Sequence, residues 1–425
     1  MDSIRANIAY PKLTYYPVDI IDIPPTLEDY NPFAEEEHPP FRVIYQWKKV
    51  DFEYPNPEMR QAAIKNKDFI PENNLPLGVD TWKHRVFITL PRWKKGVPAS
   101  LAWLPALTIN KSPALMPYPS WDWHSNSDCQ KIISVFRMKV DECGRLWLLD
   151  SGLEDITTTP RQLCPPKIVV INLVTDQMVL SFEIPKTFVK QDSLFTNIQV
   201  DIRHDQCEDA HAYITDVWRF GILVYSLQKQ KMWRVTSHLF YPDPFACDYE
   251  LHNLKFQWTD GVFGISLAPI NKEGDRVLFF HPMSSFYEFQ VSTSILRNET
   301  IWTKPGTSFQ VLGYRGPKGQ SSASGVDRDG IMFYNLVLRD SVGCWDLRKP
   351  YVGKNLGLVG AGNSSALIFP NDLKVDQEFP QGLWVLSNRL PDYLYKGLNY
   401  DDVNFRVLRA DVKDAVRGTV CDPLG

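Results

Sequence analysis

Five polar side chains stand at the ends of short apolar stretches and are the first candidates for chemistry in this sequence. They are Asp150, Asp216, His281, Asn335 and Ser387. A carboxylate there could pair with a cationic amine, while amide and hydroxyl groups could hydrogen-bond a polar ring. His281 could accept a proton from carbon if a carboxylate oriented it. The alternative is that these side chains cap strands by bonding neighbouring backbone, and that His281 is a buried histidine with a structural partner.

The stretches that precede these residues follow one repeated pattern. Each has a loop residue, then an apolar strand centred on a bulky side chain, and in five of six copies a polar end; the copies begin at residues 85, 145, 211, 276, 330 and 382. Such β-rich units at a near-regular period predict an all-β fold, a six-bladed β-propeller. We expect the repeated strands to be the inner strands, so that their ends converge on one channel mouth. Phe280 and Tyr334 could stack a ligand ring there.

The rest of the chain fits one large domain. Residues 1–40, rich in Pro and acids, predict an irregular N-terminal arm, and residues 41–425 predict a single propeller domain. Phe41–Trp47 has the character of a first strand, and it either completes the last blade or covers the barrel. Asp and Gly separate the strands and are interpreted as turn signals, as at Asp141–Gly144, Thr259–Gly261 and Asp327–Gly330.

Charge and motif content exclude several function classes. A net charge of −4 offers no basic face for nucleic acid, and no apolar run is long enough for a membrane span. Neither H-E-x-x-H, C-x-x-C, an EF-hand loop, G-x-S-x-G nor a phosphate-binding loop occurs. We therefore expect a small-molecule ligand, with no cofactor, metal, nucleic-acid or membrane partner.

Other features indicate export. Sequons for N-glycosylation occur at Asn110, Asn298 and Asn363, and seven cysteines are compatible with disulfides. The first residues lack the apolar segment of a secretory signal. We expect a secreted protein whose signal peptide is absent from this sequence.

Several segments resemble the Yellow and major royal jelly protein family of insects. The similarity runs in consistent order from about residue 41 to residue 423, and its clearest segments are Leu75–Gly78, Arg92–Ala99, Asp141–Gly152, Phe256–Trp258 with Gly264–Pro269, Val342–Trp345 and Asn404–Arg406. The resemblance implies a six-bladed propeller, secretion and a ligand site at the channel mouth.

The resemblance leaves the activity open. Members include cuticle pigmentation proteins, some of which convert dopachrome, salivary proteins that capture biogenic amines, and royal jelly proteins that bind sterol. We favour a protein that binds a catechol or amine ligand and is associated with pigmentation or cuticle melanisation. The alternative is a dopachrome conversion enzyme with His281 as its base. A second alternative is a lactonase-like hydrolase whose Ca²⁺ would be held by Asp150, Asp216 and Asn335.

The family also suggests individual residues. Amine-binding relatives draw ligand contacts from the penultimate blade, which points here to Ser321 and Asn335. Val337 is aliphatic, so the chain departs from the family if relatives carry an aromatic residue at that point. Six cysteines match cysteine positions of relatives and imply the pairs Cys143–Cys207, Cys344–Cys421 and Cys129–Cys164. Cys247 is left over as a structural thiol.

Overall fold

A computed structural model describes residues 40–300, 309–360 and 365–423. The predicted N-terminal arm and the sequon at Asn363 lie outside these ranges, so the domain boundary at residue 40 stays a prediction. In the described part of the chain, no helix combines the length and apolar character needed to cross a membrane.

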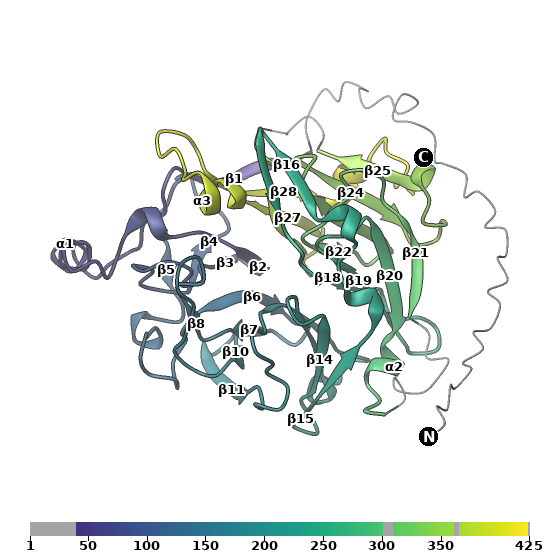
Figure 1. The fold of residues 1–425 in the computed structure, drawn as a ribbon, viewed down its shortest axis with the longest axis horizontal. Coiled ribbons are helices and arrows are strands. Elements are labelled where there is room, and N and C mark those ends of the chain that lie inside the picture. The colour runs from purple at the N-terminus through teal and green to yellow at the C-terminus, as the bar shows by residue number, and fades with distance from the viewer. Residues whose placement is uncertain (1–39, 301–308, 361–364, 424–425) are drawn as a thin grey trace, which may run out of the picture. The chain divides into compact units, whose positions relative to one another are not determined.

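The predicted six-bladed propeller is confirmed, and each blade is a four-stranded antiparallel sheet (Figure 1). Blade 1 contains β2 (Gly78–Trp82), β3 (Arg85–Thr89), β4 (Leu101–Pro105) and β5 (Met116–Pro117). Blade 2 contains β6 (Val135–Val140), β7 (Arg145–Asp150), β10 (Lys167–Asn172) and β11 (Gln177–Glu183). Blade 3 contains β12 (Phe195–Asp201), β13 (His211–Asp216), β14 (Gly221–Ser226) and β15 (Lys231–Thr236).

The second half of the ring is built in the same way. Blade 4 contains β18 (Val262–Leu267), β19 (Val277–Pro282), β20 (Tyr287–Ser292) and β21 (Gln310–Tyr314). Blade 5 contains β22 (Ser324–Val326), β23 (Ile331–Leu336), β24 (Ser341–Asp346) and β25 (Leu356–Val359). Blade 6 contains β26 (Pro370–Val375), β27 (Gly382–Ser387), β28 (Phe405–Asp411) and β1 (Arg42–Trp47).

The repeated strands are the second strands of their blades, which corrects the expectation that they are the innermost. The ring around the axis is formed by the strands before them, β2, β6, β12, β18, β22 and β26, each of which contacts the next. The second strands carry the stronger apolar pattern because they are buried on both faces between neighbouring blades; β7, β13 and β27 are buried along their whole length.

Ring closure follows one of the two predicted alternatives. Strand β1 pairs with β28, so residues near the start of the described chain complete the last blade. This pairing removes the free edges that an open array of sheets would expose. The hydrophobic core lies between blades, since each apolar cluster joins side chains from neighbouring sheets.

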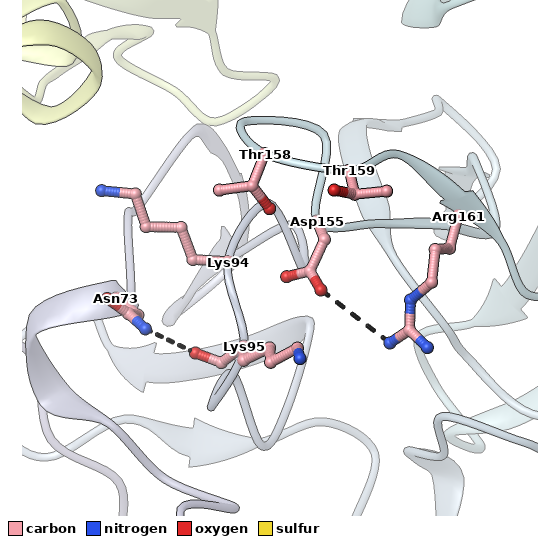
Figure 2. A pocket seen from close by; sticks show the side chains of 7 residues that line it. All are labelled: Asn73, Lys94, Lys95, Asp155, Thr158, Thr159 and Arg161. Carbon is pink, nitrogen blue, oxygen red and sulfur yellow. Dashed lines mark hydrogen bonds and ion pairs between the residues drawn. The ribbon is translucent and has the colours of Figure 1, made fainter.

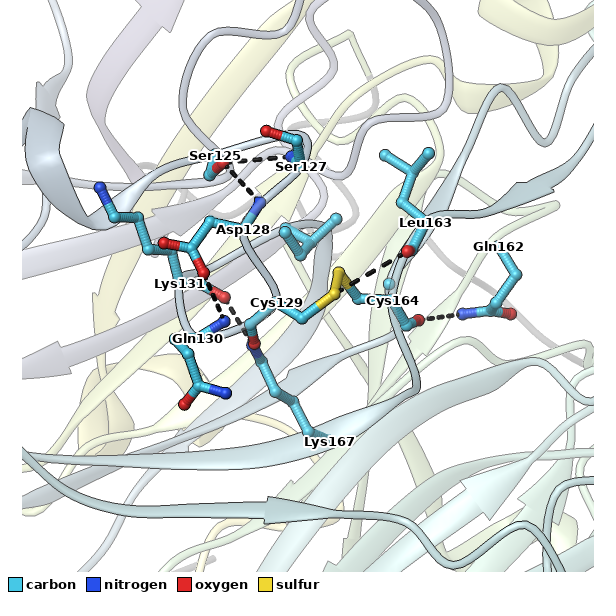
Figure 3. Close-up of a disulfide and its surroundings, with 12 residues drawn as sticks. Ser125, Ser127, Asp128, Cys129, Gln130, Lys131, Gln162, Leu163, Cys164 and Lys167 are labelled. Atoms are coloured by element: carbon cyan, nitrogen blue, oxygen red, sulfur yellow. Dashed lines mark hydrogen bonds between the residues drawn. A yellow bond between two sulfur atoms is a disulfide. The ribbon is translucent and has the colours of Figure 1, made fainter.

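All three predicted disulfides are present. Cys143–Cys207 joins blades 2 and 3, and Cys344–Cys421 ties the C-terminal tail to blade 5. Cys129–Cys164 joins two loops of blade 2, and Lys167 donates to the carbonyl of Cys129 beside it (Figure 3). Such bridges persist in oxidising surroundings, which indicates an extracellular protein. Cys247 is the free cysteine of the described residues, and burial raises the pKa of its thiol.

Candidate functional site

The predicted strand ends do gather on one face of the propeller. Asp150 pairs with Val135 at the start of β6, and Asp216 pairs with Phe195 at the start of β12. Ser387 pairs in the same way with Pro370 at the start of β26. The repeat therefore brings these strand ends to one face, where their side chains bond other parts of the protein.

Three of these side chains bond the polypeptide backbone or a buried cation. The Asp150 carboxylate accepts the backbone N–H groups of Ile133 and Ser134 at 2.9 and 2.8 Å. The Asp216 carboxylate accepts the N–H of Leu194 and pairs with Arg234 at 2.8 Å. The Ser387 hydroxyl donates to the carbonyl of Ala366. These contacts correspond to the capping alternative, and no three His, Cys, Asp or Glu side chains of the described residues form a metal-binding group.

His281 lies inside the protein rather than at the mouth. Its ring is fully buried, and Nδ1 lies 3.0 Å from the carboxylate of Glu288, which also pairs with Arg315 at 2.7 Å. Burial lowers the pKa of His281 and so favours the neutral ring. The predicted orienting carboxylate exists, but both groups are enclosed between blades.

The remaining predicted ligand residues are also buried. Asn335 donates to the hydroxyl of Ser322 at 3.2 Å, and Ser321 donates to a backbone carbonyl. Phe280 packs against Phe240 and Phe289, while Tyr334 lies in the apolar cluster around Trp345; all four predicted residues are at most 2% exposed.

An aromatic pocket lies at the same face and is lined by neighbours of the predicted residues. Its volume is about 410 Å³, within the range of small-molecule sites. Val217 and Met283 follow directly after the repeated strands β13 and β19. The pocket is lined by Leu77, Trp93, Phe136, Ile156, Thr157, Leu194, Val217, Trp218, Gln257, Trp258, Thr259, Asp260, Phe263, Met283, Phe369, Asn371, Leu390, Leu394 and Tyr395. It is thus an aromatic pocket, and among the described residues its lining includes one carboxylate, Asp260, and no Lys, Arg or His.

Irregularities in the inner strands place several of these residues. The register shifts between Val135 and Met138 in β6, between Val262 and Gly264 in β18, and between Pro370 and Asp372 in β26. The residues within these bulges include Phe136, Phe263 and Asn371, all of which line the pocket. A β-bulge re-aims the side chains of the extra residue, and bulges are common beside active sites.

Two further elements complete the walls. The hairpin of β16 (Asp248–Leu251) and β17 (Leu254–Gln257) leads into Trp258, and helix α3 (Leu390–Tyr395) supplies Tyr395. The indole Nε1 of Trp258 donates to the Tyr395 hydroxyl at 2.7 Å, which joins hairpin and helix across the rim.

Asp260 is the carboxylate that lines this pocket among the described residues. Its loop is fixed because Gly261 donates to the carbonyl of Val217 and Ser284 donates to the carbonyl of Asp260. Burial raises the pKa of Asp260 to about 6, while the Trp218 indole, which donates to Oδ1 at 3.1 Å, opposes this rise. A carboxylate with such a pKa is suited to general-base catalysis near neutral pH.

Two features of the sequence around Asp260 are relevant to its prediction. The sequence of Thr259–Gly261 predicts a turn, because Asp and Gly commonly form hairpin tips. Phe256–Trp258, directly before it, carried part of the family resemblance. An aromatic segment followed by a loop carboxylate could have marked Asp260, but neither signal reports burial.

A second, more polar pocket has a larger volume, about 470 Å³ (Figure 2). It is lined by Asn73, Lys94, Lys95, Asp155, Thr158, Thr159 and Arg161. Arg161 pairs with Glu154 and lies 3.8 Å from Asp155, so its charge is largely neutralised. Lys94 lies 3.8 Å from the ring centroid of Tyr393, and burial lowers its pKa. These contacts engage the side chains of Arg161 and Lys94 within the protein.

Comparisons with known proteins agree with the resemblance. The family model described as major royal jelly protein matches residues 133–421. A dopaminechrome tautomerase of Drosophila melanogaster is 51% identical over 389 residues, covering 90% of this chain and 84% of that protein. Protein yellow of the same species is 39% identical over 382 residues, covering 89% and 70%. Among solved structures, a virginiamycin B lyase from Staphylococcus aureus has a TM-score of 0.42 at 11% identity, covering 86% and 99%.

Proposed function

Because the chain belongs to the major royal jelly protein family, we propose that its pocket binds an aminochrome and that Asp260 catalyses tautomerisation to a dihydroxyindole. The observation that carries the proposal is a carboxylate of raised pKa in an aromatic pocket. The relative named dopaminechrome tautomerase supports the substrate class. Dihydroxyindoles are precursors of melanin, which connects the activity to the pigmentation role expected from the family.

The chemistry requires a base and a flat apolar site. An aminochrome carries an ortho-quinone fused to a saturated five-membered ring. Each proton transfer breaks one C–H bond of the saturated ring, moves that electron pair into the conjugated system and forms one O–H bond at a quinone oxygen. Two such transfers give the dihydroxyindole, and the net reaction is an isomerisation without an oxidant. The Asp260 carboxylate would take the carbon-bound proton, and its pKa of about 6 leaves it ionised at neutral pH.

The walls suit a planar ring system. Trp93, Phe136, Trp258, Phe263 and Phe369 offer faces and edges for stacking, and they exclude water from the reacting bonds. Since no lysine, arginine or histidine of the described part of the chain lines the pocket, a substrate carboxylate would find no cationic partner there beside Asp260. The pocket therefore favours an aminochrome without a carboxylate, as in the relative's name.

The test compares purified wild-type protein with Asp260→Asn, which keeps the size of the side chain. The wild type is expected to accelerate the loss of dopaminechrome absorbance, and the variant is expected to lower kcat by at least about 100-fold. Glu250→Gln also replaces a carboxylate by an amide, but at an exposed residue of the β16–β17 hairpin, and serves as the control. An Asp260→Asn protein with the wild-type rate would reject Asp260 as the base. If the wild-type protein binds dopaminechrome without converting it, the tautomerase function is rejected and the protein acts by binding alone.

A further inference from the structure

Asn371 combines near-complete burial with a position on the pocket wall. It lies within the bulge of β26, is 3% exposed and lines the pocket beside Phe369. A straight strand would direct this side chain according to the regular alternation of the sheet. The extra residue of the bulge breaks that alternation and brings an amide into a wall that is otherwise largely apolar.

Arg137 fixes the orientation of that amide. Its Nη2 donates to the backbone carbonyl of Asn371 at 2.6 Å and to the side-chain Oδ1 at 2.9 Å. A guanidinium group has donors and no acceptor, so the oxygen of the amide must face Arg137. The Nδ2 group is then turned away from the guanidinium. It is buried and has no hydrogen-bond acceptor among the described residues.

Arg137 is itself held in one place. It is fully buried, donates to the carbonyl of Ser322 at 3.0 Å and lies 3.6 Å from the carboxylate of Asp372. Its guanidinium also lies 4.6 Å from the ring centroid of Phe263, another wall of the pocket. The donor thus has a rigid support on the side opposite to the ligand.

A buried donor without an acceptor reduces stability, and native proteins satisfy nearly all such groups. Those that remain have a specific cause, and at a pocket wall one such cause is a ligand that supplies the missing acceptor. In the proposed reaction, negative charge develops on a quinone oxygen as the base removes the carbon-bound proton. A fixed donor at that oxygen would stabilise the transition state without reorganisation.

We propose that Nδ2 of Asn371 donates to a quinone oxygen of the substrate, and that Arg137 acts as a positioning residue for this amide. The assignment rests on the proposed function and extends it, because it defines the ligand as one with an acceptor oxygen on its aromatic ring. Asp260 accepts the proton from carbon, while Asn371 supports the oxygen that receives the electron pair.

The first test uses Asn371→Asp, which retains an oxygen for Arg137 and should fold, but removes the donor. We expect kcat for dopaminechrome to fall by about 100-fold, in the range found when one oxyanion-hole donor is lost. The expected change in KM is smaller. Gln290→Glu makes the same amide-to-acid change on β20, outside the pocket, and should keep wild-type rates. Wild-type kcat in Asn371→Asp would overturn the proposal.

The second test needs no turnover. 4-Nitrocatechol changes colour when its phenol ionises, so its absorbance reports the pKa of the bound ligand. A donor at the phenolate oxygen should lower that pKa in the wild-type protein by about one unit relative to Asn371→Leu. A role of Asn371 in packing alone would not produce this difference. Equal ligand pKa values in the two proteins, or no spectral change with the wild type, would reject Asn371 as the hydrogen-bond donor to the ligand.

The two proposals can fail separately. If the wild-type protein shows the nitrocatechol shift but does not convert dopaminechrome, the tautomerase function is rejected. The role of Asn371 as hydrogen-bond donor is then still supported. A protein that converts dopaminechrome equally well with Asn371→Asp rejects the donor and leaves the function standing.

Discussion

Gly264 on β18 and His281 on β19 stand opposite each other in the sheet, and the imidazole ring fills the space beside the glycine. A Cβ atom at position 264 would overlap this ring. The ring cannot move away easily because Nδ1 is bonded to buried Glu288. His281 is thus closely packed against β18, with its Nε2 buried and without a hydrogen-bond partner among the described residues, and its role as a base stays a prediction.

Gly264→Ala should therefore destabilise the fold by about 1–3 kcal/mol, as overpacking of a well-filled core does. Denaturant unfolding measures the change. Gly353→Ala is the matched control, since no atom lies within 4 Å of the new Cβ and the backbone is unstrained. Equal stability of the two variants would contradict the packing argument.

Trp218→Phe should shift the pH dependence of activity. The rate requires ionised Asp260, so kcat/KM is expected to rise with pH through about 6 and then level off. The indole N–H favours the ionised carboxylate, and its loss raises the pKa of Asp260 further. The rising limb should therefore move to higher pH in the variant, as measured by initial rates between about pH 5 and pH 8. A limb that stays in place would show that Asp260 does not control it.

Asp260→Asn should stabilise the protein at neutral pH while it removes activity. The pKa of Asp260 is raised on folding, so its ionisation lowers stability as the pH increases from about 3.8 to about 6, and the cost is constant at higher pH. Below this window the carboxyl group is protonated in both states and carries no such cost. The melting temperature of the variant should exceed that of the wild type at about pH 7.5 and approach it at about pH 4. The opposite trend would contradict the raised pKa.

Loss of the Cys344–Cys421 bridge should lower the free energy of unfolding by roughly 2–5 kcal/mol. The bridge joins residues 77 positions apart and restricts the unfolded chain accordingly. Urea unfolding of the double Cys→Ser variant measures the effect, with Cys247→Ser as the control because that thiol is unpaired. A change no larger than that of the control would show that the bridge contributes little.

Gln257→Lys should alter the preference between substrates. The new cation at the pocket rim would pair with the carboxylate of dopachrome, and an exposed pair of this kind is worth a factor of about 2–5 in affinity. The ratio of kcat/KM for dopachrome to that for dopaminechrome should rise by this factor. Gln290→Lys, away from the pocket, should leave the ratio unchanged. No change with Gln257→Lys would mean that charge at the rim does not select the substrate.

The sequence alone determined the architecture, because its signals are local and repeated. Six apolar strands at a near-regular spacing defined six blades, whereas the pairing of β1 with β28 decided between the two predicted roles of the segment around Tyr45. The repeat also predicted that the polar strand ends lie at one face, although it placed these strands innermost in their blades. The family resemblance supplied the three disulfide pairs.

Only the tertiary structure decided which residues form the site. The strand-end carboxylates bond backbone groups whose positions depend on pairing within the sheet, as Asp150 does with Ser134. The pKa of Asp260 depends on burial and on Trp218, a residue 42 positions away in the sequence. The side-chain Nδ2 of Asn371 has no acceptor among the described residues because a bulge places the amide and Arg137, 234 positions away, binds its oxygen. Residue types along a strand record which face is apolar, whereas burial, hydrogen-bond partners and bulges arise when separate blades meet around the ring.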